Sequence, residues 1–236
     1  MATEREKGDY YGPCDRAIQD MNRVSVRLFG QLKLAKFDEL HIIRDVTKVY
    51  TRLLKEAKQW LYEVCFEAYL LGLALCDIKG EKAHRMAEKA IDREWVEALV
   101  NEPDFVTGYE FEAETERKKQ RLIEGLAAVA LVMSAGGDLR EAVGPGGTDT
   151  SGGTDARIEK ALRDWSRMFG QEAISATDAA VTEAMDDAEI TNVMWISQKD
   201  QRVCTECHRL DGQIFPLDAV PPKPHWGCRC RIRPVG

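Results

Sequence analysis

Four of the seven cysteines lie after residue 200, at positions 204, 207, 228 and 230, and His225 stands between the two pairs. Cys-x-x-Cys is the spacing with which two thiolates hold one metal ion, and His225-x-x-Cys228 offers further donors from a second loop. A tetrahedral zinc site needs four ligands. The credible donors number five, which leaves the choice of four open: Cys204, Cys207, His225, Cys228 and Cys230. We predict one structural zinc per chain, and we rank His208 below these donors because it directly follows a ligand.

Other uses of this cysteine pattern fit the sequence less well. The N-terminus MATEREKGDYYG does not show the order of a secretion signal, so we expect a reducing compartment, where clustered cysteines favour metal over disulfides. A redox Cys-x-x-Cys normally opens a helix in a βαβ unit, which is not indicated here. A catalytic zinc would keep an open position and a general base, and neither HExxH nor the deaminase pattern is present. A segment of about 40 residues needs such a metal to fold well.

The rest of the chain shows mainly helical periodicity. Apolar residues recur in steps of three and four over residues 38–76, 81–100, 111–134 and 155–189, which predicts amphipathic helices. Cys65 and Cys76 fall within the first of these, where we assign them no chemistry. No apolar run approaches the roughly 20 residues that span a bilayer, so no membrane segment is expected.

The predicted fold is mainly α, with long helices in an extended helical body and a small β-rich zinc-binding knob at the C-terminus. We divide the chain into a helical body (1–135), a flexible glycine-rich loop (136–154), a long helix (155–191) and the zinc-binding C-terminal module (192–236). Within the module, β-branched and aromatic residues predict strands near 192–197 and 230–235, and Asp211-Gly212 is a hairpin turn signal.

The charge of the chain is unevenly distributed. The formal net charge is −7, but residues 200–236 hold six Lys/Arg against four Asp/Glu, which leaves −9 for residues 1–199. Residues 219–236 include no acidic residue, and a solvated C-terminus would look the same. Their basic side chains are candidates for contact with nucleic acid or a protein partner: Lys223, Arg229, Arg231 and Arg233.

The C-terminal module resembles the phage head morphogenesis family, also called Mu F-like minor head proteins. The shared pattern is an aromatic strand, an Asp before Cys-x-x-Cys, Leu-Asp-Gly, a proline-rich spacer and a terminal His-x-x-Cys-x-Cys. The matching residues are Trp195, Asp200, Cys204, Cys207, Leu210, Asp211, Gly212, Pro221, Pro222, His225, Cys228, Arg229 and Cys230. The resemblance is specific over 192–235 and weaker over 173–189, and residues 1–150 carry no motif of the family.

This resemblance implies a minor capsid protein of a tailed phage or prophage. The implied role is structural, at the portal or capsid during head assembly and DNA packaging or delivery, in several copies per virion and in the host cytoplasm during assembly. The implied partners are the portal protein, the major capsid protein, or both, with packaged DNA as a further candidate. We expect no enzyme, because no nucleophile elbow, Walker loop or catalytic carboxylate pair stands in context. The alternative function is a zinc-stabilised nucleic-acid-binding module, which the acidic body disfavours.

Overall fold

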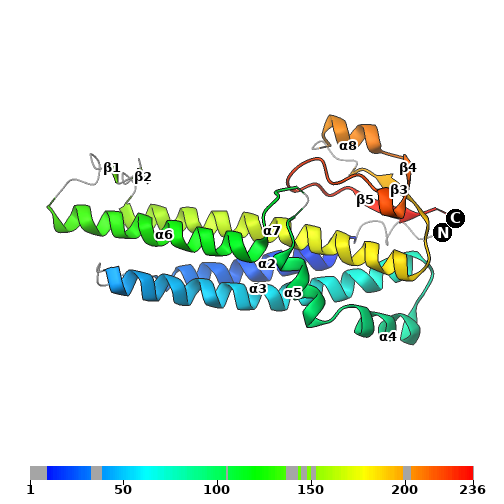
Figure 1. The fold of residues 1–236 in the computed structure, drawn as a ribbon, viewed down its shortest axis with the longest axis horizontal. Coiled ribbons are helices and arrows are strands. Elements are labelled where there is room, and N and C mark those ends of the chain that lie inside the picture. Colours follow the sequence, from blue (N-terminus) through cyan, green and yellow to red (C-terminus); the bar gives the residue numbers. More distant parts are fainter. Residues whose placement is uncertain are drawn as a thin grey trace. The chain divides into compact units, whose positions relative to one another are not determined.

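The computed structural model describes residues 10–32, 39–104, 106–136, 143–144, 148–149, 153–198 and 203–235. Long helices dominate these residues, as predicted (Figure 1). The helices are α2 (Gly12–Phe29), α3 (Glu39–Leu75), α4 (Gly80–Ala90), α5 (Arg93–Asn101), α6 (Phe111–Ser134), α7 (Gly153–Asp187) and the short α8 (Thr205–Leu210). None of the described helices has the length and apolar character needed to span a membrane.

The strands form two small antiparallel sheets. Two-residue strands β1 (Val143–Gly144) and β2 (Thr148–Asp149) pair with each other. The C-terminal sheet has the order β4-β3-β5, built from β3 (Asn192–Ile196), β4 (Ile214–Pro216) and β5 (Arg231–Pro234). The predicted fold class, a mainly helical chain with a small β-containing module at its C-terminus, is confirmed.

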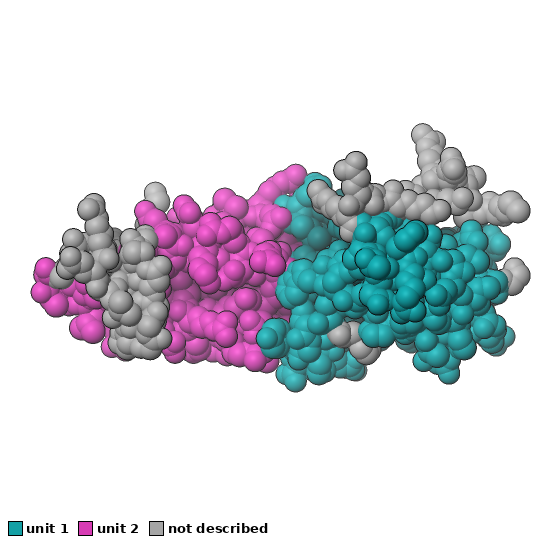
Figure 2. Space-filling model, turned by 90° about the horizontal axis from the view of Figure 1, so that it is seen from above, with its two compact units in different colours: residues 1–19, 58–110, 170–236 teal, residues 20–57, 111–169 magenta. Residues whose placement is uncertain are grey.

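The chain separates into two compact units (Figure 2). Unit 1 comprises residues 1–19, 58–110 and 170–236, and unit 2 comprises residues 20–57 and 111–169. The unit boundaries fall within α2, α3 and α7, so each of these helices belongs partly to unit 1 and partly to unit 2.

Unit 2 has an aromatic core to which all four of its helical segments contribute. The ring of Tyr50 in α3 meets Phe29 of α2 edge-on at 5.8 Å and Trp165 of α7 edge-on at 6.0 Å, measured between ring centroids. Phe111, the first residue of α6, lies 5.8 Å from Trp165. All four rings are buried. Such pairs contribute about 0.5–1.5 kcal/mol each beyond their buried area.

Unit 1 depends on a close approach of α3 and α7. The buried face of α7 is small, with Ala173, Ala176, Ala180 and Ala184 all fully buried. A Cβ added to Gly72 of α3 would lie 2.6 Å from the Ala184 Cβ and 3.0 Å from the Val181 carbonyl oxygen, closer than real contacts allow. The small face of α7 and the missing side chain at Gly72 together allow this close approach.

Several local predictions need correction. Residues 81–100 form two helices, because the backbone turns at Ile91 and the Asp92 side chain then caps α5 by accepting from the Trp95 N–H at 2.8 Å. Helices α2 and α8 were not predicted. The Asp211-Gly212 turn connects α8 to β4 and not two strands. Most of the predicted glycine-rich loop, at 137–142, 145–147 and 150–152, lies outside the described residues.

Candidate metal centre

Two tight turns aim the predicted donors at one another. Cys204 is the N-cap of α8, where its Sγ accepts the backbone N–H of Cys207 at 3.3 Å, so the first helical turn sets the two thiols side by side. In the second loop the Cys228 N–H donates to the His225 carbonyl oxygen at 3.2 Å. Gly227 has a φ of +68°, a left-handed conformation that glycine adopts without strain. Each turn therefore presents two side chains to the same space.

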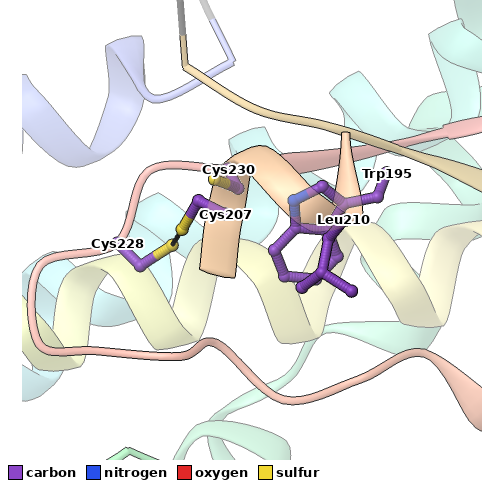
Figure 3. Close-up of a cluster of buried hydrophobic side chains, with 5 residues drawn as sticks. All are labelled: Trp195, Cys207, Leu210, Cys228 and Cys230. Atoms are coloured by element: carbon purple, nitrogen blue, oxygen red, sulfur yellow. Dashed lines mark hydrogen bonds between the residues drawn. The ribbon is translucent and has the colours of Figure 1, made fainter. Parts of the chain in front are cut away.

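All five predicted donors gather in two overlapping groups. One contains Cys204, Cys207 and His225, the other Cys207, Cys228 and Cys230, and within each group every pair of donor atoms lies within 4.8 Å. Cys207 Sγ is 3.4 Å from His225 Nε2. It is 3.5 Å from Cys228 Sγ, the contact that Figure 3 marks with a dashed line. Tetrahedral zinc with ordinary bond lengths would hold sulfur and nitrogen about 3.6 Å apart and two sulfurs about 3.8 Å apart. These separations are close to those of zinc ligands, so the three donors of either group could hold a metal ion, and Cys207 is common to both groups.

The orientation of His225 suits a metal ligand. Its Nδ1 lies 2.9 Å from the Trp226 carbonyl oxygen, which can only accept, so Nδ1 carries the proton. In the neutral imidazole, Nε2, which faces Cys207, then has the lone pair that a metal ion needs. A carbonyl partner on the second ring nitrogen is the usual way in which proteins orient a zinc-binding imidazole.

The electrostatics of the thiols also favour a cation. Burial raises the pKa of Cys207 to about 12. The pKa of Cys228 is also raised, mainly by a hydrogen bond with Cys230 and to a smaller extent by burial. The thiol of Cys228 donates to Cys230 and lowers the pKa of Cys230 to about 5, while the Cys207 N–H lowers that of Cys204. Neighbouring thiolates repel one another, so only some of these groups ionise unless a positive charge lies between them. A bound zinc ion would supply that charge.

Apolar side chains enclose the cysteines. Trp195 of β3 and Leu210 of α8 form one buried cluster with Cys207, Cys228 and Cys230 (Figure 3). The partly buried residues packed against it are Val203, Cys204, Phe215 and Val220. His208, ranked below the five donors in the sequence, is an exposed residue of α8 and belongs to neither donor group.

Lys223 ties the loop that carries His225, Cys228 and Cys230 to Tyr11, directly before α2, and to α7. Lys223 Nζ lies 3.2 Å from Asp178 Oδ2 of α7, and it donates to the Cys230 carbonyl oxygen and, at 3.0 Å, to the Tyr11 hydroxyl. The Tyr11 hydroxyl is 2.9 Å from Asp178 Oδ1 and 2.8 Å from the Cys230 carbonyl oxygen, so its single proton serves one of them at a time. Burial raises the pKa of Asp178, while Lys223 and the hydrogen bond from Tyr11 act in the opposite direction.

Two more contacts hold the same loop. The Arg229 guanidinium binds the Asp15 carboxylate of α2 with two nitrogens, one of them at 2.9 Å, and lies 5.3 Å from the centroid of the Tyr11 ring. The Gly227 N–H donates to Gln171 Oε1 of α7 at 2.8 Å. The C-terminal module is therefore attached to the helices of unit 1 by an ion-paired, hydrogen-bonded network.

The four predicted contact residues lie in different settings. Lys223 and Arg229 face acidic partners within the chain. Arg231 is half-buried and Arg233 is exposed, both on β5. Sequence reasoning did not identify the partners Tyr11, Asp15, Gln171 and Asp178. The only signal for Asp178 was an acidic residue within the alanine-rich stretch of α7.

Comparison with known proteins supports the resemblance. Residues 152–233 match the family model described as Phage Mu protein F like protein. That range covers the whole of α7 and the C-terminal module through β5 up to Arg233, including all five metal donors. No curated protein and no solved structure matches the chain. The resemblance to the Mu F-like family is therefore confirmed over the C-terminal part of the chain.

Proposed function

We propose that this chain, which carries a Mu F-like segment over residues 152–233, is a minor head protein of a tailed phage or prophage. It acts structurally at the portal or capsid during head assembly and DNA packaging or delivery. The observation that carries the proposal is the family match over α7 and the C-terminal module, which includes the five clustered Cys/His donors.

The metal centre suits a structural role. Its five candidate donors outnumber the four positions of a tetrahedral zinc. Four protein ligands would leave no position open, whereas a catalytic zinc keeps one for water or substrate. We propose one zinc per chain, held by four of the five donors. Its binding energy then stabilises the fold of the module, as in other small domains with structural zinc.

The arrangement of the basic residues supports a protein partner over nucleic acid. Proteins that bind DNA through its backbone neutralise several phosphates with Lys and Arg. Lys223 and Arg229 are already paired with Asp178 and Asp15. The portal protein and the major capsid protein are the proposed partners, in a virion that holds several copies of this chain.

Co-expression of the full chain with the portal protein of the same phage or prophage tests the proposal. We expect a complex that survives size-exclusion chromatography, and we expect the chain in purified particles. Absence of the chain from particles and from every complex with portal or capsid protein would contradict a role in the head. Substrate turnover that requires the metal ligands would contradict a purely structural role.

A further inference from the structure

The C-terminal sheet has two chemically different faces. Val193 and Trp195 of β3 are buried, and their cross-strand neighbours Phe215 and Ile232 lie on the same side of the sheet. Successive residues of a strand point to opposite faces, so the residues between them form a second face. We call this second face, with Asn192, Met194, Ile196, Ile214, Pro216, Arg231 and Arg233, the outer face.

The outer face carries a row that crosses all three strands. Met194 at the centre of β3 is paired with Ile214 of β4 on one side and with Arg233 of β5 on the other. Ile214 is 53% exposed, Arg233 is exposed and Met194 is half-buried. The next pair, Ile196 with Arg231, repeats the combination of an apolar residue and an arginine. An apolar strip thus lies beside a basic edge.

We propose that the outer face of the β4-β3-β5 sheet is a docking surface for an acidic protein segment that also carries apolar side chains. The proposal rests on the head-protein function and adds the contact surface and the chemistry of its partner. Exposed Arg233 provides the charge complementarity, with half-buried Arg231 two residues away on the same strand. Residues 219–236 contain no Asp or Glu. Exposed Ile214 and half-buried Met194, which lie in the same row as Arg233, supply the apolar contact.

The same residues fit a protein better than a nucleic acid. Arginine and methionine are enriched in protein interfaces, and arginine is frequent among the residues that contribute most binding energy. Two arginines provide few phosphate contacts compared with the six to ten that make DNA binding strongly dependent on salt. Phosphates also gain nothing from an adjacent apolar strip. DNA is therefore the competing occupant that the experiment must test.

The partner docks on the face and does not extend the sheet. Within the described residues, β4 and β5 are the two edge strands of the sheet, and an edge strand can pair with a further strand. Each contains a proline, Pro216 in β4 and Pro234 in β5, which has no N–H to donate to a neighbouring strand. Side chains, rather than backbone hydrogen bonds, would therefore supply the binding energy.

Binding of the full-length chain to the portal and capsid proteins is the first test, with three variants compared with the unaltered chain. We expect Arg233→Glu to weaken binding about tenfold and to reduce its salt dependence, because it reverses a charge at the contact. Ile214→Thr keeps the β-branch and should weaken binding several-fold. Arg93→Glu reverses an exposed charge at the N-terminus of α5, where an acidic residue is tolerated, and should bind normally.

A second probe separates this inference from the proposed function. Fluorescence anisotropy would measure binding of the same proteins to a peptide of alternating glutamate and leucine and, in parallel, to a DNA duplex. We expect the peptide to bind the unaltered chain even if portal and capsid proteins do not. Arg233→Glu should weaken peptide binding most, Ile214→Thr less, and Arg93→Glu should leave it unchanged. Equal peptide binding by Arg233→Glu and the unaltered chain would overturn the inference. Loss of DNA binding with unchanged peptide binding would overturn it in favour of nucleic acid.

Discussion

Replacing Lys223 with Met tests how the C-terminal module is held on the helices. Methionine keeps much of the aliphatic stem near Trp195, whose ring centroid lies 5.5 Å from Lys223 Nζ, but it removes the charge and every hydrogen bond of the ammonium group. The Asp178 carboxylate loses its ion-pair partner at 3.2 Å and keeps the hydroxyl of Tyr11 at 2.9 Å.

The magnitude follows from how deeply the pair is buried. Breaking a buried ion pair by removing one partner costs about 3–5 kcal/mol of unfolding free energy. The side chains of Lys223 and Asp178 keep 16% and 22% of their surface exposed. Water therefore offsets part of the loss, and we expect about 3 kcal/mol at neutral pH. Lys58→Met is the control, because Glu97, the partner of Lys58, is 52% exposed. The control should cost less than about 1 kcal/mol.

The loss should also depend on pH. Burial raises the pKa of Asp178, and Lys223 counteracts this, so removing the lysine raises the folded-state pKa further. A carboxyl with a raised pKa binds a proton more readily in the folded chain than in the unfolded one. Its destabilising effect is complete above the folded-state pKa and fades as the pH falls through that value. The cost of Lys223→Met should therefore be smaller at a mildly acidic pH than at neutral pH.

Urea unfolding followed by circular dichroism at both pH values measures these quantities. The double variant Lys223→Met/Asp178→Asn removes the unpaired charge, so it should be more stable than Lys223→Met alone and should lose the additional pH dependence. The reasoning fails if Lys223→Met costs no more than Lys58→Met, or if Asp178→Asn recovers none of the loss.

Three further predictions concern the helices and the glycine-rich segment. Gly72→Ala should lower the unfolding free energy by about 1–2 kcal/mol, because overpacking against α7 exceeds the gain in helix propensity. Gly170→Ala, whose added Cβ would meet its nearest atom at 3.8 Å, should raise the unfolding free energy by about 0.5–1 kcal/mol. Equal effects of the two substitutions in urea unfolding would contradict the close approach of α3 and α7. Asp92→Ala removes the cap of α5 and should cost about 1 kcal/mol in the same assay, with no change counting against the capping role. Limited proteolysis should cut first within 136–155, because seven glycines lie between 136 and 153, and a first cut inside α3 would refute this.

The clustering of the candidate metal donors could be predicted from the sequence because their spacing is local. Cys204 and Cys207 are three positions apart, and His225 and Cys228 repeat that interval. Each pair of metal-binding side chains can therefore be recognised within four consecutive residues. The long helices were predictable for a similar reason, since apolar residues repeat with the helical period over many turns. The short helix α8 was missed because its N-cap is Cys204, a residue type that does not mark helix starts in sequence.

The attachment of the module could not be predicted from local patterns. Tyr11 is 219 positions from Cys230, and Asp15 is 214 positions from Arg229, and no periodicity links residues at such separations. The same contacts also bear on what loss of the metal should do to the helices. A module that shares Lys223 and Asp178 with the helices should pass part of its instability to unit 1 when the metal is removed, rather than unfold alone.

The metal content of the full-length chain tests the central claim most directly. Native mass spectrometry of protein purified without chelator should show one zinc per chain, and Cys207→Ser, which alters the donor common to both groups, should reduce this to well below one. Cys76→Ser, a change to a half-buried cysteine outside these groups, should retain the metal. Removing zinc with a chelator should lower the thermal unfolding temperature. A folded chain that is free of metal, and whose unfolding temperature a chelator does not change, would contradict the account.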